Sequence, residues 1–270
     1  STFTLGLYLI EKKNDVYLAS KIEYSNFGDD ILIRDVKVFG DAIWISTLRS
    51  GLLKCKWNEK GFLVVESYHS KSGLRTDAVN TMLIDREGTL WIGTFGEGLA
   101  SKGDNLFTFY FANPKGYYQV KSILANKDEV WVANTEEITV RNKHTLKELK
   151  SFNAENGLPN DIISAMHFTE DSVFFVGTEH SGLYRYVPST NSFKEILLSG
   201  DDLSLTITSL KSLDSQLWIG TLNGVYKMNV ETEGIVSYDV SSGLSHNSVG
   251  DVLITKTGDV FIGARSAFLN

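Results

Sequence analysis

The sequence predicts an all-β fold, a β-propeller of six four-stranded blades, on three observations. A Trp or Phe followed by a short apolar stretch recurs about every 43 residues, the period of propeller blades, at Trp44, Trp91, Trp131, Phe175, Trp218 and Phe261. Runs of β-branched and aromatic residues, bounded by Gly, Asp and Asn, fill the intervals as strands do. Apolar residues almost never recur at helical spacing, which excludes a helical fold.

Composition narrows the class of protein. The 270 residues are 42% hydrophobic and 22% charged, as in soluble globular chains that bury a sizeable core. The net charge of −7 argues against a nucleic-acid binder, which needs clustered Lys and Arg. No apolar run approaches the ~20 residues of a membrane helix, so this segment is expected to make no membrane contact. The single cysteine, Cys55, excludes an internal disulfide and a CxxC zinc site.

The repeat around Trp91 shows the expected order of strands within one blade. Residues 79–85, 89–95, 98–102 and 106–111 are predicted as its first to fourth strands, the first being innermost. The second strand is nearly continuously apolar, as expected for a strand covered on both faces. Gly93 inside it predicts close approach of a neighbouring backbone or bulky ring. The 23 glycines, against roughly 19 expected from average usage, are thus placed by the repeat.

The two ends of the chain each supply half a blade. Residues 5–10 and 16–22 resemble third and fourth strands, and residues 245–270 supply only a first and a second strand. We therefore expect the N-terminal outer strands to pair with the C-terminal inner strands and close a ring, which would remove exposed edges. The alternative is an open fragment of a longer array. The predicted single domain, 1–270, divides into outer strands at 1–22, repeats at about 23–70, 71–113, 114–155, 156–198 and 199–241, and inner strands at 242–270.

Recurrent spacing inside the repeat resembles a known family. The segments Gly73-Leu-Arg-Thr-Asp-Ala-Val, Gly157-Leu-Pro-Asn-Asp-Ile-Ile and Gly243-Leu-Ser-His-Asn-Ser-Val precede the inner strands, and Asp-x-x-Gly-x-Leu-Trp-Ile-Gly-Thr comes next in the strongest copy. This pattern resembles the two-component regulator propeller repeat, almost throughout residues 73 to 100. The third unit, with Trp131-Val-Ala-Asn, lacks the glycine and matches weakly.

The resemblance implies an extracytoplasmic sensor region of a bacterial hybrid two-component regulator. Such a region is periplasmic or extracellular, although the N-terminus Ser-Thr-Phe-Thr shows no signal peptide. Its partners would be an oligosaccharide or other small envelope ligand and downstream signalling domains or a dimer partner absent from this chain, with no cofactor and no nucleic acid. The repeat itself encodes a scaffold, so the ligand must be read from the loops.

The candidate ligand site lies on the connections from fourth to first strands and from second to third strands, which open on one face. Phe95 and the histidines could stack on a sugar, the carboxylates and amides could bond hydroxyls, and the arginines would suit a uronate or sulfate. The alternative is that these are ordinary polar loop residues. The predicted ligand-binding residues are Arg49, Arg75, Asp77, Phe95, Glu97, Asp161, Glu179, His180, Asn223, His246, Asn247 and Arg265.

No catalytic or metal site is predicted. The five histidines show no HxH or HExxH spacing, so no metal-binding motif is present in the sequence. His167 replaces a leucine of the sister repeats and is expected to be a packed strand residue. His180 stands beside Glu179 and Ser181, but adjacency in sequence does not create a catalytic triad. Alternation along its strand predicts that Cys55 is a packed thiol.

Three classes of function remain open from the sequence. The favoured one is a sensor module whose loop face binds an oligosaccharide or other envelope ligand. The second is a structural or protein-binding propeller, whose signature would be a shallow apolar face. The third, a propeller lyase or hydrolase, would require a histidine and acidic residues converging around a metal.

Overall fold

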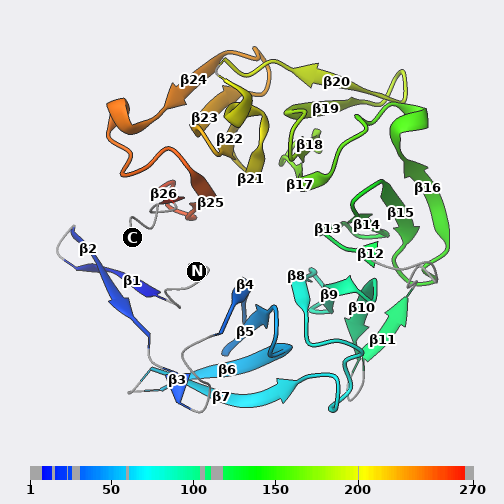
Figure 1. Ribbon diagram of the computed structural model, residues 1–270, viewed down its shortest axis with the longest axis vertical. Coiled ribbons are helices and arrows are strands. Elements are labelled where there is room, and N and C mark those ends of the chain that lie inside the picture. The colour runs from blue at the N-terminus through cyan, green and yellow to red at the C-terminus, as the bar shows by residue number, and fades with distance from the viewer. Residues whose placement is uncertain are drawn as a thin grey trace. The chain divides into compact units, whose positions relative to one another are not determined.

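A computed structural model describes residues 8–13, 16–22, 24–25, 31–58, 61–103, 107–110, 118–199 and 201–264 (Figure 1). These residues form β-strands and three short 3₁₀ helices. None of the described helices has the length and apolar character needed to cross a membrane.

Five blades of four strands succeed one another along the chain, as the colours of Figure 1 show. Blade 1 comprises β4 (Ile33–Phe39), β5 (Ala42–Thr47), β6 (Leu52–Asn58) and β7 (Gly61–Tyr68). Blade 2 comprises β8 (Val79–Ile84), β9 (Leu90–Gly96), β10 (Leu99–Lys102) and β11 (Phe107–Tyr110). Blade 3 comprises β13 (Ser122–Ala125), β14 (Glu129–Ala133), β15 (Ile138–Asn142) and β16 (Glu148–Phe152).

Blade 4 comprises β17 (Ile163–Phe168), β18 (Phe174–Thr178), β19 (Leu183–Val187) and β20 (Ser192–Ile196). Blade 5 comprises β21 (Ile207–Leu213), β22 (Gln216–Thr221), β23 (Gly224–Asn229) and β24 (Ile235–Tyr238). Two short strands, β3 (Tyr24–Ser25) and β12 (Tyr118–Gln119), add to β7 and β9. The all-β propeller class is confirmed, and the strands predicted for the repeat around Trp91 agree with β8 to β11 to within one residue at each end.

The prediction of six blades in a closed ring is wrong. Strands β1 (Tyr8–Lys13) and β2 (Val16–Lys21) pair only with each other among the described residues, and so do β25 (Val249–Ile254) and β26 (Val260–Ala264). The two pairs therefore form two separate two-stranded sheets, not a sixth blade. The physical reason is that pairing strands so distant in sequence costs loop-closure entropy, whereas all six residues of β2 remain exposed and gain little burial in return.

The chain divides into two compact units. Unit 1 comprises residues 1–132 and 141–147, and unit 2 comprises residues 133–140 and 148–270. Blades 1 and 2 belong to unit 1, blades 4 and 5 belong to unit 2, and the residues of blade 3 are divided between the two.

Unit 1 is held by apolar packing and by one buried ion pair. The predicted close approach at Gly93 in β9 is confirmed, because a Cβ there would lie 2.4 Å from Cγ1 of Val120, but the neighbour is a valine side chain and not the backbone or ring that the sequence predicted. The Asp85 carboxylate, which comes directly after β8, accepts a hydrogen bond of 2.9 Å from the Trp91 indole and pairs with the Lys143 ammonium at 3.0 Å. The side chains of Asp85 and Lys143 are only 1% and 4% exposed. The Asp and Trp of the repeat are therefore joined to a third residue in the next blade.

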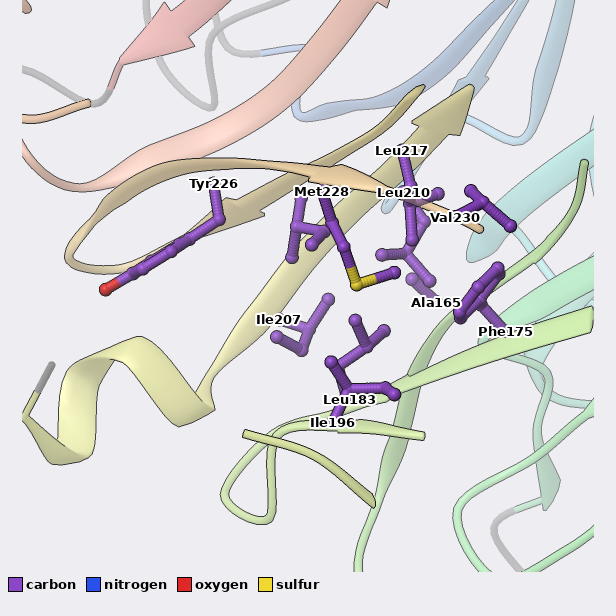
Figure 2. Packing of buried hydrophobic residues seen from close by; sticks show 11 residues of the cluster. Ala165, Phe175, Leu183, Ile196, Ile207, Leu210, Leu217, Tyr226, Met228 and Val230 are labelled. Atoms are coloured by element: carbon purple, nitrogen blue, oxygen red, sulfur yellow. The ribbon is translucent and has the colours of Figure 1, made fainter. Parts of the chain in front are cut away.

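Unit 2 has an apolar interior built from blades 4 and 5 (Figure 2). Phe175 from β18, Ile207 and Leu210 from β21 and Met228 from β23 are all buried in one cluster. Gly177 repeats the role of Gly93, because a Cβ there would lie 2.4 Å from Cγ2 of Ile207. In both units the strand-interior glycine thus leaves room for a β-branched side chain, which comes from Val120 just before β13 in unit 1 and from Ile207 at the start of β21 in unit 2.

Short 3₁₀ helices occupy three of the connections that lead to inner strands. They are η1 (Ala154–Asn156), η2 (Asp202–Leu205) and η3 (Val240–Ser242), all in unit 2. Each begins at an Asn or Asp whose side chain accepts a backbone N–H, as N-caps do. These capped turns fix the connections on which several of the predicted ligand-binding residues lie.

Candidate functional site

The connections between second and third strands share a rigid turn. Thr178 at the end of β18 donates its hydroxyl to the Gly182 carbonyl at 3.0 Å and accepts the Ser181 N–H at 3.0 Å. Thr47 and Thr94 make the same two bonds in unit 1, with Gly51 and Ser50 and with Gly98 and Glu97. The buried Thr of the repeat is therefore a turn cap, a role that the sequence analysis missed although the Thr-x-x-x-Gly spacing recurs in the sequence.

This turn presents two or three residues that differ from blade to blade. The presented residues include six of the predicted set, Arg49, Phe95, Glu97, Glu179, His180 and Asn223. Arg49, Phe95 and His180 are exposed, whereas Glu97, Glu179 and Asn223 are partly buried. Because the frame is constant and these residues vary, the fold does not require their identity.

Two of the connections from fourth to first strands share a second set of hydrogen bonds, which we call the second frame. Asp77 accepts the Ser70 N–H at 2.6 Å, and Asn247 accepts the Val240 N–H at 2.8 Å, each seven residues upstream. Their backbone carbonyls accept the N–H groups of Gly51 and Gly224 from the preceding blade, at 2.8 and 2.7 Å. The side chains of Asp77 and Asn247 therefore hold the loop itself, in addition to the ligand-binding role that the sequence predicts.

Asp161 departs from this second frame. Its loop is capped instead by Asn153 and Asn156, which hold each other's backbone around η1. The Asp161 carboxylate, 7% exposed, accepts the His180 backbone N–H at 2.7 Å and lies 3.0 Å from His180 Nδ1. The sequence motif is thus unchanged, while the side chain is redirected to the adjacent loop of unit 2.

The contact between Asp161 and His180 lowers the pKa of the carboxyl and raises the pKa of the imidazole. Burial acts to raise the pKa of Asp161, but hydrogen bonds from the His180 side chain and from backbone N–H groups outweigh it and lower that pKa to about 2. The hydrogen bond and the negative charge of Asp161 raise the pKa of His180. Since 73% of the His180 side chain is exposed, the pair presents the Nε2 edge of the ring to solvent, with Nδ1 held by a buried carboxylate.

A chain of hydrogen bonds extends along the neighbouring loops of unit 2. Asn247 donates its amide to the Asn223 oxygen at 3.2 Å, and Asn223 donates its amide to the Asp201 carboxylate at 3.0 Å. The chain therefore ends at Asp201, which was not among the predicted ligand-binding residues. Asp201 is exposed and keeps acceptor capacity for a further donor.

The loop that carries Asp201 is anchored to the interior of unit 2. The Tyr226 hydroxyl from β23 donates to the Ser199 carbonyl at 2.5 Å and lies 2.9 Å from the buried Ser204 hydroxyl of η2. Figure 2 shows the Tyr226 hydroxyl pointing away from the apolar cluster. Thr206 joins this loop to the next, donating to the Glu179 carbonyl at 2.7 Å. We define the rim of unit 2 as the residues Asp161, Glu179, His180, Asp201, Asn223 and Asn247.

The remaining predicted residues are not members of this rim. His246 accepts the Ser248 N–H on Nδ1 at 2.9 Å, which turns it into its own loop. Arg49, Arg75, Asp77, Phe95 and Glu97 belong to unit 1. Arg265 lies outside the described residues.

Two residues assigned to packing are confirmed in that role. His167 in β17 lies 2.8 Å from the Ser212 hydroxyl, and burial, aided by the charge of Lys211, lowers the pKa of His167 to about 4. Cys55 in β6 is buried, and burial raises the pKa of its thiol to about 11. Within the part of the chain that the structure describes, no group of three or more His, Cys, Asp or Glu side chains could hold a metal ion.

One copy of the repeat matches a known protein family. Residues 73–96 match the family described as two component regulator propeller. Histidine kinase P4 of Formosa agariphila is 26% identical over 198 residues, which cover 66% of this chain and 14% of the kinase. The chain thus spans about a seventh of that relative.

Solved structures share the fold at low identity. The extracellular domain of a hybrid two component system from B. thetaiotaomicron matches with a TM-score of 0.60 and 16% identity, over 96% of this chain and 42% of that one. Virginiamycin B lyase from Staphylococcus aureus matches with a TM-score of 0.68 and 14% identity, over 86% of this chain and 77% of the lyase. Both likenesses show the fold alone.

Proposed function

The chain carries the two-component regulator propeller repeat, and on that basis we propose that it is the extracytoplasmic ligand-recognition module of a two-component signalling protein. The family match and the extracellular domain of the B. thetaiotaomicron system support this assignment. The ligand would bind on the rim of unit 2 and bias a conformational equilibrium of the whole protein, which requires different affinities for two states.

The redirected Asp161 carries the proposal. In the other described copies of the motif, the Asp or Asn side chain accepts the N–H seven residues upstream in its own loop, whereas Asp161 accepts the His180 N–H and faces its Nδ1. The Asp161 side chain can face the adjacent loop because Asn153 and Asn156 already cap η1. Local departure from a repeated structural role is expected where a site has been added to a scaffold.

The chemistry of the rim favours a polyhydroxylated ligand such as an oligosaccharide. Asp201, Glu179 and the Asn223 oxygen are acceptors that suit hydroxyl donors, and the exposed Nε2 of His180 adds one further hydrogen-bonding group. The hydrogen bonds that join these side chains fix their orientation before a ligand arrives, which lowers the entropic cost of binding.

Binding without turnover is part of the proposal. His180 Nδ1 faces Asp161 as in a catalytic triad, but Ser181 hydrogen-bonds to Asp161 and not to the outward Nε2. A triad requires the nucleophile to be hydrogen-bonded to the base on that side. The geometry therefore favours a ligand contact over nucleophilic catalysis.

A glycan array on the purified 270-residue chain, followed by calorimetry of each hit, tests this function. We expect His180→Ala and Asn223→Ala to weaken binding by about tenfold or more, the effect of losing a charged or network hydrogen bond. His144→Ala is the matched control, since His144 is an exposed histidine in the turn after β15. Binding unchanged in both rim variants, or release of a cleaved product, would contradict the proposal, and binding of only a protein partner would favour a scaffold.

A further inference from the structure

Arg75 stands on the same fixed frame as Asp77, in unit 1. Leu74 is 3% exposed and packs in a buried cluster with Met82 and Ile92. Asp77 accepts both the N–H and the hydroxyl of Ser70, at 2.6 and 3.2 Å. The backbone on both sides of Arg75 is therefore held in place, and the corresponding positions in the sister motifs carry Pro159 and Ser245.

The side chain of Arg75 is held by an aromatic ring. Its guanidinium lies 4.8 Å from the centroid of the Phe109 ring. Arg34 and Arg185, by contrast, direct their guanidinium groups to Asn80 and Glu233. Among the described residues, no carboxylate pairs with Arg75, although the chain has 33 acidic residues. Stacking on an aromatic ring leaves the N–H edge of a guanidinium open to bind an anion in two places.

The local charge favours an anion. The Gly51 N–H donates to the Asp77 carbonyl at 2.8 Å, which brings the turn carrying exposed Arg49 beside the loop of Arg75. Lys71 lies in the same loop. On these two segments, three cationic residues, Arg49, Lys71 and Arg75, therefore stand against the single carboxylate of Asp77.

We propose that Arg75, stacked on Phe109 and flanked by Arg49, forms an oxyanion-binding site in unit 1. It would accept a carboxylate, sulfate or phosphate group through the N–H edge of the guanidinium. This site uses none of the residues of the rim of unit 2, which offers mainly acceptors. A negative result for one proposal therefore leaves the other unaffected.

The test titrates sulfate, phosphate and acetate separately into the full chain at constant ionic strength, following backbone amides by NMR. Constant ionic strength removes general screening, which would mimic weak binding. We expect saturable shifts centred on residues 69–78, with the three anions ranked by affinity to separate a tetrahedral group from a carboxylate. Arg75→Ala should weaken binding by about tenfold and Arg75→Lys by less, because lysine cannot bind bidentately.

Arg86→Ala is the matched control, since Arg86 is an exposed arginine in the turn before β9. Phe109→Leu should weaken binding by a smaller factor than Arg75→Ala, since it removes only the orienting ring. Equal losses in Arg75→Ala and Arg86→Ala, or no saturable shift for any anion, would overturn the proposal.

Discussion

Asp77 in unit 1 and Asp161 in unit 2 occupy the same position of one repeated motif, but their carboxylates hydrogen-bond to different loops. Asp77 binds the start of its own loop, whereas Asp161 orients His180 from the adjacent loop. The frame of unit 1 consequently presents cations, Arg49 and Arg75, while that of unit 2 presents a rim of acceptors with a single histidine. The repeat therefore keeps backbone geometry constant and lets individual side chains be reassigned.

The two units also differ at the residue directly after the inner strand, where we expect the greatest effect on stability. Unit 1 has Asp85 in a buried pair with Lys143, whereas Thr169 takes the same position in unit 2 and accepts the Val173 N–H. Asp85→Ala should lower the free energy of unfolding by about 3 kcal/mol, because it removes the acceptor of the buried Trp91 indole N–H and of the Thr89 N–H and leaves the buried Lys143 with Glu87 as its carboxylate partner. Thr169→Ala should cost about 1 kcal/mol. Urea unfolding, with hydrogen exchange to locate the loss in β8 to β11, measures both, and equal losses would contradict the distinction.

Acid should affect the same ion pair. Burial acts to raise the pKa of Asp85, but hydrogen bonds from Trp91 and Lys143 lower it below the usual value. A carboxyl with a lowered folded pKa stabilises the protein above its unfolded pKa of about 3.9, and that contribution is lost as pH falls through the folded value. The difference in unfolding free energy between wild type and Asp85→Ala should therefore shrink below about pH 4.

Replacing the glycine inside the second strand, Gly93 in unit 1 or Gly177 in unit 2, should lower the free energy of unfolding by the same amount in both units. Gly93→Ala and Gly177→Ala each place a Cβ 2.4 Å from a neighbouring side-chain carbon. Overpacking of this kind costs about 1–3 kcal/mol, measured by urea unfolding. Gly234→Ala is the control, because its nearest neighbour, the Thr232 hydroxyl, lies 3.4 Å away. A loss in only one unit would show that the repeat does not pack equivalently.

The smallest effect concerns the charge of His180. Asp161→Asn removes the negative charge that raises the pKa of His180, so the NMR titration of its ring should move to lower pH. A histidine with a raised folded pKa stabilises the protein below its unfolded pKa and loses that contribution as pH rises through the folded value. Asn223→Ala should leave the titration of His180 in place. A His180 titration unaffected by Asp161→Asn would show that the pair does not form.

Local chemistry made much of the fold predictable. The strand boundaries around Trp91, the close approach at Gly93 and the packing of His167 and Cys55 all result from alternation, turn residues and the 43-residue period. The number of blades was not predictable in this way. Whether β1 and β2 pair with β25 and β26 depends on a balance of loop entropy against buried area, which no local pattern records.

The candidate site was likewise predictable only in part. The sequence alone identified which residues lie on the connections, because the position of a residue within the repeat predicts whether it belongs to a strand or a loop. Arg75, Asp161, His180 and Asn223 were among the residues it singled out. The three-dimensional arrangement was needed to show that Asp77 and Asn247 hold their own loops, that Asp161 instead faces His180, and that Asp201 receives the amide chain. The physical reason is that a hydrogen bond depends on distance and direction between separate loops, and identical motifs can satisfy their backbone in more than one way.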